Sequence, residues 1–327
     1  MIETILTFIS SAIIQGTPLL FGSTGEIITE KSGNLNLGIP GIMYVGGISG
    51  IIGGYLYEHH VAEPNAFLCL IIPFLSCIIG SVIMALIYSF LTITLRANQN
   101  VTGLALTTFG IGVGNFFGGS LLKFFGESGS ISLINCGKSF KATLPFADDL
   151  GLFGKTFLSF GFMVYLALII AFITSFVLNK TRVGLNLRAV GENPATADSA
   201  GINVIKYKYL ATCIGGAVAG LGGLYFVMDY TGGAWTNNGF GDRGWLAIAI
   251  VIFAIWRPTM SILASYLFGG LYILSVVIPG LSSSTKEIIN MLPYLVTILV
   301  LIIISIQKKR ENQPPASLGL SYFREER

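Results

Sequence analysis

Two glycine-rich stretches have the residue types of phosphate-binding sites, but both lack the context that such a site needs. The stretch GLFGKT at residues 151–156 ends in the Gly-Lys-Thr of a phosphate loop, but Asp149 stands where the first glycine belongs. The stretch GFGDRG at residues 239–244 has the GxGxxG spacing of a dinucleotide site. No strand pattern precedes it, and no acidic residue follows about 20 positions later. Because the chain contains 41 glycines, such spacings arise by chance, and we predict no nucleotide site.

The histidines and cysteines form no metal-binding or catalytic pattern. His59 and His60 are the only histidines; they stand side by side in an expected outer loop, and no HExxH motif accompanies them. Three of the four cysteines, at positions 69, 77 and 213, fall inside expected membrane spans, which leaves Cys136 alone in an outer loop. We therefore expect a solvated histidine pair, no metal site and no disulfide framework.

The acidic residues are poorly placed for proton transfer, channel selectivity or catalysis. A proton-coupled transporter needs a carboxylate deep inside a span, whereas Glu26, Asp229 and Asp242 stand at the ends of expected spans. An ion channel would carry a ring-forming charged set at mid-span, and a membrane enzyme would combine His, Asp, Glu or Ser within its spans. The sequence shows neither pattern, which disfavours a channel and a membrane enzyme. An ion-coupled secondary transporter is the alternative class that stays open, although none of these carboxylates is a good candidate for its relay.

The composition of the whole chain is that of a polytopic membrane protein. Of its 327 residues, 53% are hydrophobic and only 11% are charged. Its apolar runs are continuous rather than alternating, and many reach the about 20 helical residues that cross a hydrocarbon core, which favours helices over a barrel. We predict an all-α polytopic helical bundle, one domain of residues 1–327, with about nine spans in a range of eight to ten. The expected spans are residues 2–24, 41–57, 66–95, 101–122, 157–179, 209–229, 244–257, 259–281 and 286–307.

Positive charge assigns the sides of the membrane, because short cytoplasmic loops carry an excess of lysine and arginine. The loop of residues 180–208 contains five basic and two acidic residues, and the tail of residues 308–327 opens with Lys-Lys-Arg. Both are placed in the cytoplasm, which puts the N-terminus and the loops of residues 58–64 and 146–150 outside. The net charge of +3 then reflects cytoplasmic loops near anionic membrane lipid and implies no nucleic-acid partner.

Two apolar regions contain interruptions that a straight helix cannot accommodate. Residues 25–47 read GEIITEKSGNLNLGIPGIMYVGG, so asparagines, glycines and a proline exclude a continuous helix there. Residues 232–258 contain a second glycine-rich interruption before a short apolar run. Lipid cannot satisfy the freed backbone groups, so each interruption must face protein or water and is a candidate for a translocation pathway, with close glycine packing as an equal alternative. The candidate pathway residues are Asn36, Gly38, Gly41, Gly241 and Gly244, and among them Gly38 and Gly41 line up with Gly241 and Gly244.

A third candidate lies at the start of the fourth expected span, within residues 96–119. Four uncharged polar residues open this span, at positions 98, 99, 100 and 102, and they could contact a polar, neutral solute. Helix capping by Asn or Thr explains one or two of them. We therefore add Asn100, Thr102 and Gly103 to the candidate pathway residues. The glycines at positions 110, 112 and 114 indicate close helix packing.

The long cytoplasmic loop contains a segment suited to binding another protein. Within RAVGENPATADSAGINV, residues 188–204, Asn193 can cap a short helix that Pro194 begins and Gly201 ends. The alanines of this helix leave a low-relief surface that a groove on a partner could grip. Charged residues at its rim are available for pairing with the partner, and they are Arg188, Glu192 and Asp198.

Three segments together resemble the permease subunits of ABC transporters in the branched-chain amino acid and simple-sugar group. GLNLRAVGENPATADSAGINVIKYK at residues 184–208 resembles their cytoplasmic coupling segment and is most similar to the nucleoside branch. TPLLFGSTGEIITEKSGNLNLGIPGIM at residues 17–43 resembles their opening, and GDRGWLAIAIVIFAIWRP at residues 241–258 resembles a later motif of the same subunits. The sequence departs from the family pattern at Pro40, where many members have glutamate, and at Ala254, where glycine is common.

The resemblance implies a subunit of an ATP-driven importer in the bacterial cytoplasmic membrane, which works by alternating access and performs no covalent chemistry. Its implied partners are a second, related permease, an extracytoplasmic substrate-binding lipoprotein and a cytoplasmic ABC ATPase that holds ATP and magnesium, so no cofactor is expected on this subunit. The scarcity of charge within the spans favours an uncharged polar solute; nucleosides come first, with simple sugars and riboflavin as alternatives. The implied coupling positions are Arg188, Gly191, Glu192, Asn193, Pro194, Ala197, Asp198, Ala200 and Gly201.

Overall fold

The computed structural model describes residues 2–126, 129–143, 151–278, 280–307 and 313–323, and these form a bundle of helices. Besides these helices, the described residues contain one isolated β-bridge, between Ser132 and Ala234. The predicted all-α membrane bundle is confirmed. The elements are α1 Ile2–Glu30, α2 Ile39–His60, α3 Ala66–Ser89, η1 Phe90–Thr94, α4 Gln99–Phe124, α5 Ile134–Phe140, α6 Gly151–Phe157, α7 Phe162–Lys180, α8 Arg182–Glu192, α9 Pro194–Ser199, α10 Val204–Tyr225, η3 Phe226–Tyr230, α11 Arg243–Phe253, α12 Pro258–Val277, α13 Ser283–Asn290 and α14 Leu292–Gln307.

Eight helices of the described chain are long and apolar enough to cross a membrane, which lies within the predicted range. The predicted span of residues 244–257 is a half-length helix: α11 has 11 residues and a length of about 16 Å, too short for a core of roughly 30 Å. It ends where Ile255 and Trp256 adopt positive φ angles of 55° and 52°, just before Pro258 begins α12.

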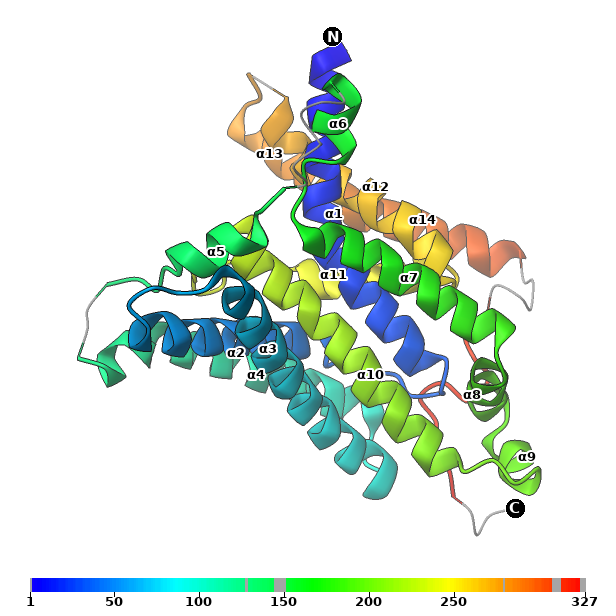
Figure 1. Cartoon of the computed structure of the whole chain (residues 1–327). Coiled ribbons are helices and arrows are strands. Elements are labelled where there is room, and N and C mark those ends of the chain that lie inside the picture. Colours follow the sequence, from blue (N-terminus) through cyan, green and yellow to red (C-terminus); the bar gives the residue numbers. More distant parts are fainter. Residues whose placement is uncertain (1, 127–128, 144–150, 279, 308–312, 324–327) are drawn as a thin grey trace.

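The N-terminus and the C-terminus lie at opposite ends of the molecule (Figure 1). The irregular residues 231–242 lead into the half-length α11. The helices α8 and α9 share the end of the C-terminus, which we call the coupling end (Figure 1). This arrangement agrees with the predicted placement of loop 180–208 and the tail on one side and the N-terminus on the other; Lys308–Arg310 and residues 146–150 lie outside the described residues.

Two helices extend beyond their predicted spans by five residues or more at one end. α1 continues to Glu30 rather than residue 24, and both Glu26 and Glu30 in this extension are buried by other helices. α10 begins at Val204 rather than residue 209, because the Asn203 side chain caps it by accepting a hydrogen bond from the Lys206 N–H at 2.9 Å. Hydropathy treats polar residues as span ends, whereas capping and tertiary contacts decide where a helix stops.

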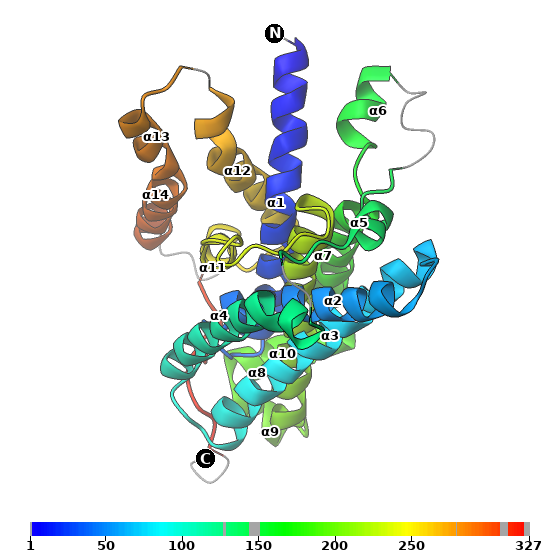
Figure 2. The same cartoon turned by 90° about the vertical axis from the view of Figure 1, so that its left-hand side faces the viewer.

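The most deeply buried long helix is α2, which packs against α3, α4 and α10 (Figures 1 and 2). Its glycines let α10 approach to backbone distance. A Cβ on Gly46 would lie 2.7 Å from the Cα of Gly220, and one on Gly47 would lie 3.1 Å from the carbonyl oxygen of Gly223. On its other side α10 packs against α1, which in turn contacts α11 and α12. The helix α10 therefore joins the helices around α2 to those around α1.

The expectation that Cys136 stands alone in an outer loop is wrong. Cys136 on α5 is buried beside the buried Cys69 of α3 and the carboxylate of Glu58, and their three potential ligand atoms lie within 4.8 Å of one another. The backbone N–H of Cys136 donates a hydrogen bond to this carboxylate at 2.5 Å. The thiols are far apart in the sequence, so only the packing of α5 on α3 brings them together. His59 and His60 are exposed as predicted, but they form the last turn of α2 rather than a loop.

Candidate functional site

The predicted coupling helix is present as α9. The Asn193 side chain caps it by accepting a hydrogen bond from the Thr196 N–H at 3.0 Å, and Pro194 is its first residue. Gly201 follows the helix with a φ of +83°, a conformation that glycine adopts without strain. The local signals in the sequence therefore predicted this element correctly.

The helix α8, which was not predicted, precedes α9 and holds it against the bundle. Its buried residues include Gly184, Leu187 and Val190, whose spacing of three is that of one face of a helix. Val190 packs with Ala197 of α9 and Val204 of α10 in a small apolar cluster. We call residues 182–201, from α8 to the end of α9, the coupling segment.

The nine predicted coupling residues differ in exposure. Those that are exposed can contact another protein, whereas those that are half-buried or buried connect the coupling segment to the rest of its own chain. Glu192, Asn193, Ala200 and Gly201 are exposed; Arg188, Pro194 and Asp198 are half-buried; Gly191 and Ala197 are buried.

Gly191 brings the coupling segment into contact with the loop that follows α1. A Cβ at this position would clash with the carbonyl oxygen of Lys31 and would lie 3.3 Å from the backbone nitrogen of Gly33. Lys31 also lies near Glu192: burial lowers the pKa of the Lys31 ammonium group, and the Glu192 carboxylate opposes this shift. Because backbone meets backbone here, a displacement of the coupling segment must displace this loop.

The described tail, residues 313–323, binds to the same junction. The N–H and the hydroxyl of Ser317 both donate hydrogen bonds to the carbonyl oxygen of Gly191, at 3.0 and 2.6 Å. The N–H of Gly319 donates to the carbonyl oxygen of Gly33 at 3.2 Å. The tail therefore links the coupling segment to the loop after α1.

The side chain of Tyr322 extends this connection to α9. Its hydroxyl donates a hydrogen bond to the carboxylate of Asp198 at 2.8 Å, so this predicted rim charge has a partner within the chain. Sequence reasoning treated the tail only as a source of positive charge. The sequence signal that the tail packs on the protein was its apolar residue Leu318. In the structure, Leu318 packs against a buried cluster that includes Leu187 of α8.

Residues 31–38, which we call the inner interruption, are enclosed by protein. None of them is exposed. The N–H of Asn36 donates a hydrogen bond to the Glu26 carboxylate at 3.0 Å. The N–H of Leu35 donates to the side-chain oxygen of Gln99 at 2.7 Å. Side chains from α1 and α4 thus satisfy the backbone groups that the break in the helix leaves open.

Four predicted pathway glycines meet around the start of α2. A Cβ on Gly41 would lie 2.5 Å from a backbone oxygen of α4, and one on Gly103 of α4 would lie 2.8 Å from a backbone nitrogen of the inner interruption. A Cβ on Gly244 of α11 would lie 2.5 Å from a Cα of α2, and one on Gly38 would lie 2.8 Å from the Asn36 side-chain oxygen. These positions fit the close-packing alternative, because glycine lets α2, α4 and α11 meet at backbone distance.

The polar residues at the start of α4 occupy different environments. Asn98 caps the helix by accepting a hydrogen bond from the Val101 N–H at 3.1 Å. Gln99 is buried and reaches the inner interruption, whereas Asn100 is exposed and Thr102 is buried. Of the candidate pathway residues here, Asn100 alone presents its side chain to the surroundings of the chain.

Residues 231–242, which we call the outer interruption, are more open. The residues at positions 236–238 are exposed, and Gly241 has a φ of +56°, where an added Cβ would make only ordinary van der Waals contacts with Tyr272 and Arg243. Asn238 exchanges two hydrogen bonds with Asn115 of α4, at 2.9 and 3.3 Å. The outer interruption therefore presents amide groups on the side of α4.

Arg243, the first residue of α11, is a buried cation that sequence reasoning missed. Its guanidinium donates hydrogen bonds to the carbonyl oxygen of Phe240 at 2.9 Å and to the side chain of Gln15 at 3.1 Å. It also lies 4.7 Å from the ring centres of Phe226 and Tyr272, which is cation–π distance. Arg243 thereby fixes the start of α11 against α1, η3 and α12. The sequence signal was a single arginine that opens an apolar run.

The assignment of Glu26 to the end of a span is wrong, because α1 continues past it by a further turn. Glu26 and Glu30 are both buried, and Glu30 accepts a hydrogen bond from the indole N–H of Trp256. The two carboxylates hold the inner interruption and the end of α11 against α1. Asp242 remains exposed next to the start of α11, as predicted.

Comparisons with known proteins agree with this architecture. Residues 8–304 match the family described as branched-chain amino acid transport system / permease component. The chain is 32% identical over 307 residues to the nucleoside ABC transporter permease protein NupC of Lactococcus lactis, covering 92% of each chain. It is 31% identical over 345 residues to the putative glucose ABC transporter permease protein TsgC13 of Haloferax volcanii, covering 97% of each. It is 29% identical over 309 residues to the guanosine ABC transporter permease protein NupQ of Bacillus subtilis, covering 92% of each.

The family match spans both interruptions and the coupling segment. The eight apolar helices are those of a multi-pass protein of the cell membrane. From the match over nearly the whole chain and the helical bundle together, the chain belongs to the branched-chain amino acid transport system / permease component family.

Proposed function

We propose that this chain is the permease subunit of an ATP-driven importer for nucleosides. Two of the similar proteins are named as permeases for nucleosides and for guanosine, and each alignment covers 92% of this chain. The observation that carries the proposal is the contact between Gly191 in the coupling segment and Lys31 in the inner interruption. It connects a surface that a separate motor can bind with a break inside the helical bundle.

A cytoplasmic ABC ATPase is the proposed motor, and it holds the ATP and the magnesium. The exposed residues Glu192, Asn193, Ala200 and Gly201 form its contact surface on this chain. A second, related permease completes the pathway, and a substrate-binding lipoprotein delivers the solute at the end opposite the coupling segment. This subunit then contributes movement rather than bond chemistry.

The proposed mechanism is alternating access driven through the inner interruption. Closure of the ATPase moves α8 and α9, and the contacts of Gly191 transmit that movement to residues 31–38. The hydrogen bond from Leu35 to Gln99 then transmits the movement to α4, and the close approach of Gly244 to Pro40 transmits it to α11. The outer interruption, which leads into α11, then changes its position relative to α4.

A simple sugar is the second candidate solute. The putative glucose permease from Haloferax volcanii is as similar to this chain as the nucleoside permeases and covers 97% of it. Sugars and nucleosides are both uncharged and polar, so the low charge of the spans fits either. Only competition between solutes separates the two.

The solute is tested by uptake of labelled guanosine into cells that carry this chain with its neighbouring transporter components. Unlabelled adenosine, glucose, ribose and riboflavin are the competitors. We expect adenosine alone to compete. Competition by glucose or ribose would identify the solute as a sugar, and competition by riboflavin would identify it as riboflavin. Either outcome overturns the nucleoside assignment.

The coupling role is tested by the substitution Ala200→Arg, with Ala62→Arg as the matched control. Both alanines are exposed, but Ala200 lies in the coupling segment and Ala62 lies in the loop between α2 and α3. We expect Ala200→Arg to abolish uptake and to release the ATPase from the purified complex, while Ala62→Arg leaves ATPase binding unchanged. Retention of the ATPase by the Ala200→Arg variant would contradict the coupling role.

A further inference from the structure

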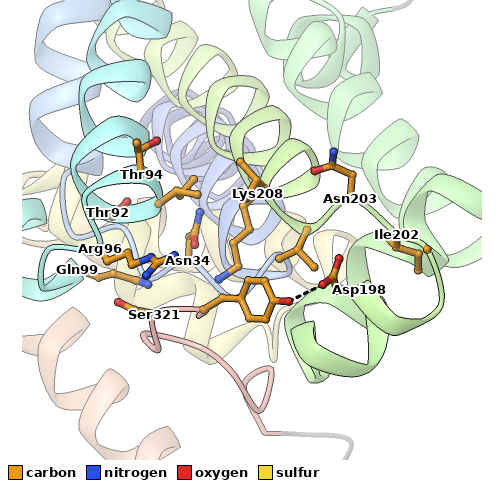
Figure 3. A pocket seen from close by; sticks show the side chains of 15 residues that line it. Asn34, Thr92, Thr94, Arg96, Gln99, Asp198, Ile202, Asn203, Lys208 and Ser321 are labelled. Atoms are coloured by element: carbon orange, nitrogen blue, oxygen red, sulfur yellow. Dashed lines mark hydrogen bonds between the residues drawn. The ribbon is translucent and has the colours of Figure 1, made fainter. Parts of the chain in front are cut away.

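The coupling end contains a polar cavity of about 430 Å³ that four separate parts of the chain enclose (Figure 3). The inner interruption, the end of η1 with the start of α4, the coupling segment with the start of α10, and the tail each supply part of its wall. Representative residues from these four parts are Asn34, Arg96, Gln99, Asp198, Lys208 and Tyr322.

Lys208 supplies the feature that distinguishes this cavity. Its side chain runs from α10 into the cavity, and the residue is only 3% exposed (Figure 3). Its ammonium group forms no hydrogen bond or ion pair with the described residues, and the carboxylate in the same cavity wall, that of Asp198, accepts a hydrogen bond from Tyr322. Lys206, one half-turn earlier on the same helix, is exposed to solvent in the ordinary way. A buried lysine without a counter-charge is unfavourable, so the position is explained best by an anion from outside the described residues.

The other charged and polar groups of the cavity favour the same ligand. Arg96 adds a second cation to the wall, and Asn203 and Gln99 add side-chain amides (Figure 3). The carboxylate of Asp198 is the one acidic group among the lining residues, and it accepts a hydrogen bond from Tyr322. The wall therefore has an excess of positive charge.

We propose that this cavity binds a phosphate group through the ammonium of Lys208. A phosphate presents several acceptor oxygens and at least one negative charge, and lysine is a common point-charge partner for it. The cavity is larger than one phosphate, so it has room for a sugar or a glycerol attached to the group. The phosphate can belong to a soluble phosphate ester of the cytoplasm or to an anionic lipid headgroup, because both present the same chemistry.

A bound phosphate would connect the moving parts of the coupling end. It would touch α10 at Lys208 and lie between the tail, the inner interruption and the start of α4, so it would resist their relative displacement. A phosphate ligand would therefore slow the coupling movement. This regulatory consequence rests on the proposed function, whereas the binding of phosphate does not.

The test uses the full chain, purified in an uncharged maltoside detergent without phosphate, and measures its unfolding temperature. The variant is Lys208→Met, which keeps the apolar stem and removes the charge, and the control is Lys206→Met. Inorganic phosphate and adenosine 5′-monophosphate are titrated as soluble probes. Phosphatidylcholine nanodiscs with and without phosphatidylglycerol provide the lipid arm.

We expect one probe to raise the unfolding temperature of the wild-type chain in a saturable way. Lys208→Met should lose about tenfold to a hundredfold of that affinity, as expected for one hydrogen bond to a charged group. Lys206→Met should bind like the wild type. Stabilisation by the soluble probes identifies a phosphate ester, and stabilisation by phosphatidylglycerol alone identifies a lipid headgroup; both support the proposal.

Two outcomes would overturn it. One is that neither soluble phosphate nor phosphatidylglycerol stabilises the wild-type chain. The other is that Lys208→Met and Lys206→Met retain the same affinity. Because the readout is binding by the isolated chain, its failure would leave the proposed transport function untouched, and a failure of nucleoside uptake would leave this result standing.

Discussion

Both interruptions break the regular backbone hydrogen bonding of a helix, but they differ in how far they are exposed. The inner interruption has no exposed residue, and Glu26 and Gln99 accept hydrogen bonds from its freed N–H groups. The outer interruption exposes residues 236–238, and it turns through glycines with positive φ, of which Gly241 is one. One interruption is closed by other helices, and the other is open to its surroundings.

This difference teaches that a break in a membrane helix is not in itself a solute site. The inner interruption contacts the coupling segment, the tail and the start of α4, as the proposed mechanism requires of a junction between them. The outer interruption offers exposed amides beside α4, which is the chemistry that a neutral polar solute requires. Mutations in the inner interruption should therefore affect stability and coupling, and those in the outer one should affect the solute.

The largest effect is expected from Gly191→Ala, which would disrupt the contact between the coupling segment and the inner interruption. The new Cβ would clash with the carbonyl oxygen of Lys31, and overpacking of this kind costs about 1–3 kcal/mol or more. We expect nucleoside uptake to fall about tenfold or more. The control is Gly112→Ala, where a Cβ meets nothing within 4 Å. Equal uptake by the two variants, at equal amounts in the membrane, would show that the junction is not needed.

The second prediction separates the acceptor role of Glu26 from its charge. Glu26→Leu leaves the Asn36 N–H without its acceptor in a buried site, which destabilises the chain by about 1–3 kcal/mol. Glu26→Gln keeps an acceptor oxygen at the same place and should recover most of this loss. The unfolding midpoint of the purified chain measures both. Loss of stability in the glutamine variant as large as in the leucine variant would assign the effect to the charge.

The third prediction compares two glycines with positive φ, one from each interruption. Gly33→Ala and Gly241→Ala both strain the backbone by about 1–2 kcal/mol. The Cβ at Gly33 would also lie 2.5 Å from the hydroxyl oxygen of Ser317, whereas the Cβ at Gly241 would meet its nearest atom, the Tyr272 hydroxyl oxygen, at an ordinary 3.6 Å. We therefore expect Gly33→Ala to lower the unfolding midpoint further.

A double variant tests the cause of that difference. Ser317→Ala removes the hydroxyl that the new Cβ would meet, so Gly33→Ala should be less damaging in its presence than alone. Additive effects of the two substitutions would show that the tail does not press on Gly33.

The smallest effect on stability is expected from Asn115→Ala in the outer region. It removes two exposed hydrogen bonds with Asn238, and because water can replace both, we expect each to contribute about 0.5 kcal/mol or less. We expect the unfolding midpoint to stay nearly unchanged and the KM for nucleoside uptake to rise. A change in stability without a change in KM would reverse the comparison and make the outer interruption a structural element.

The sequence predicted the parts of the site that depend on neighbouring residues. Asn193, Pro194 and Gly201 specify α9 through capping and φ preferences, and all three lie within that short stretch. The position of α1's end was misjudged because polarity at Glu26 has the same local appearance whether the residue is solvated or buried. The proximity of Cys136 to Cys69 and Glu58 was missed because these residues lie on other helices, α3 and α2.

By itself the sequence determined a multi-pass helical membrane protein with two interruptions and a capped surface helix, because hydropathy, helix breaking and capping act over a few residues. Only the tertiary structure decided which interruption is closed and which is open. It also decided that the tail binds the coupling segment, through a bond from Tyr322 to Asp198 across 124 positions. Such contacts depend on how helices pack, and the packing follows from side-chain shape over the whole bundle rather than from any local pattern.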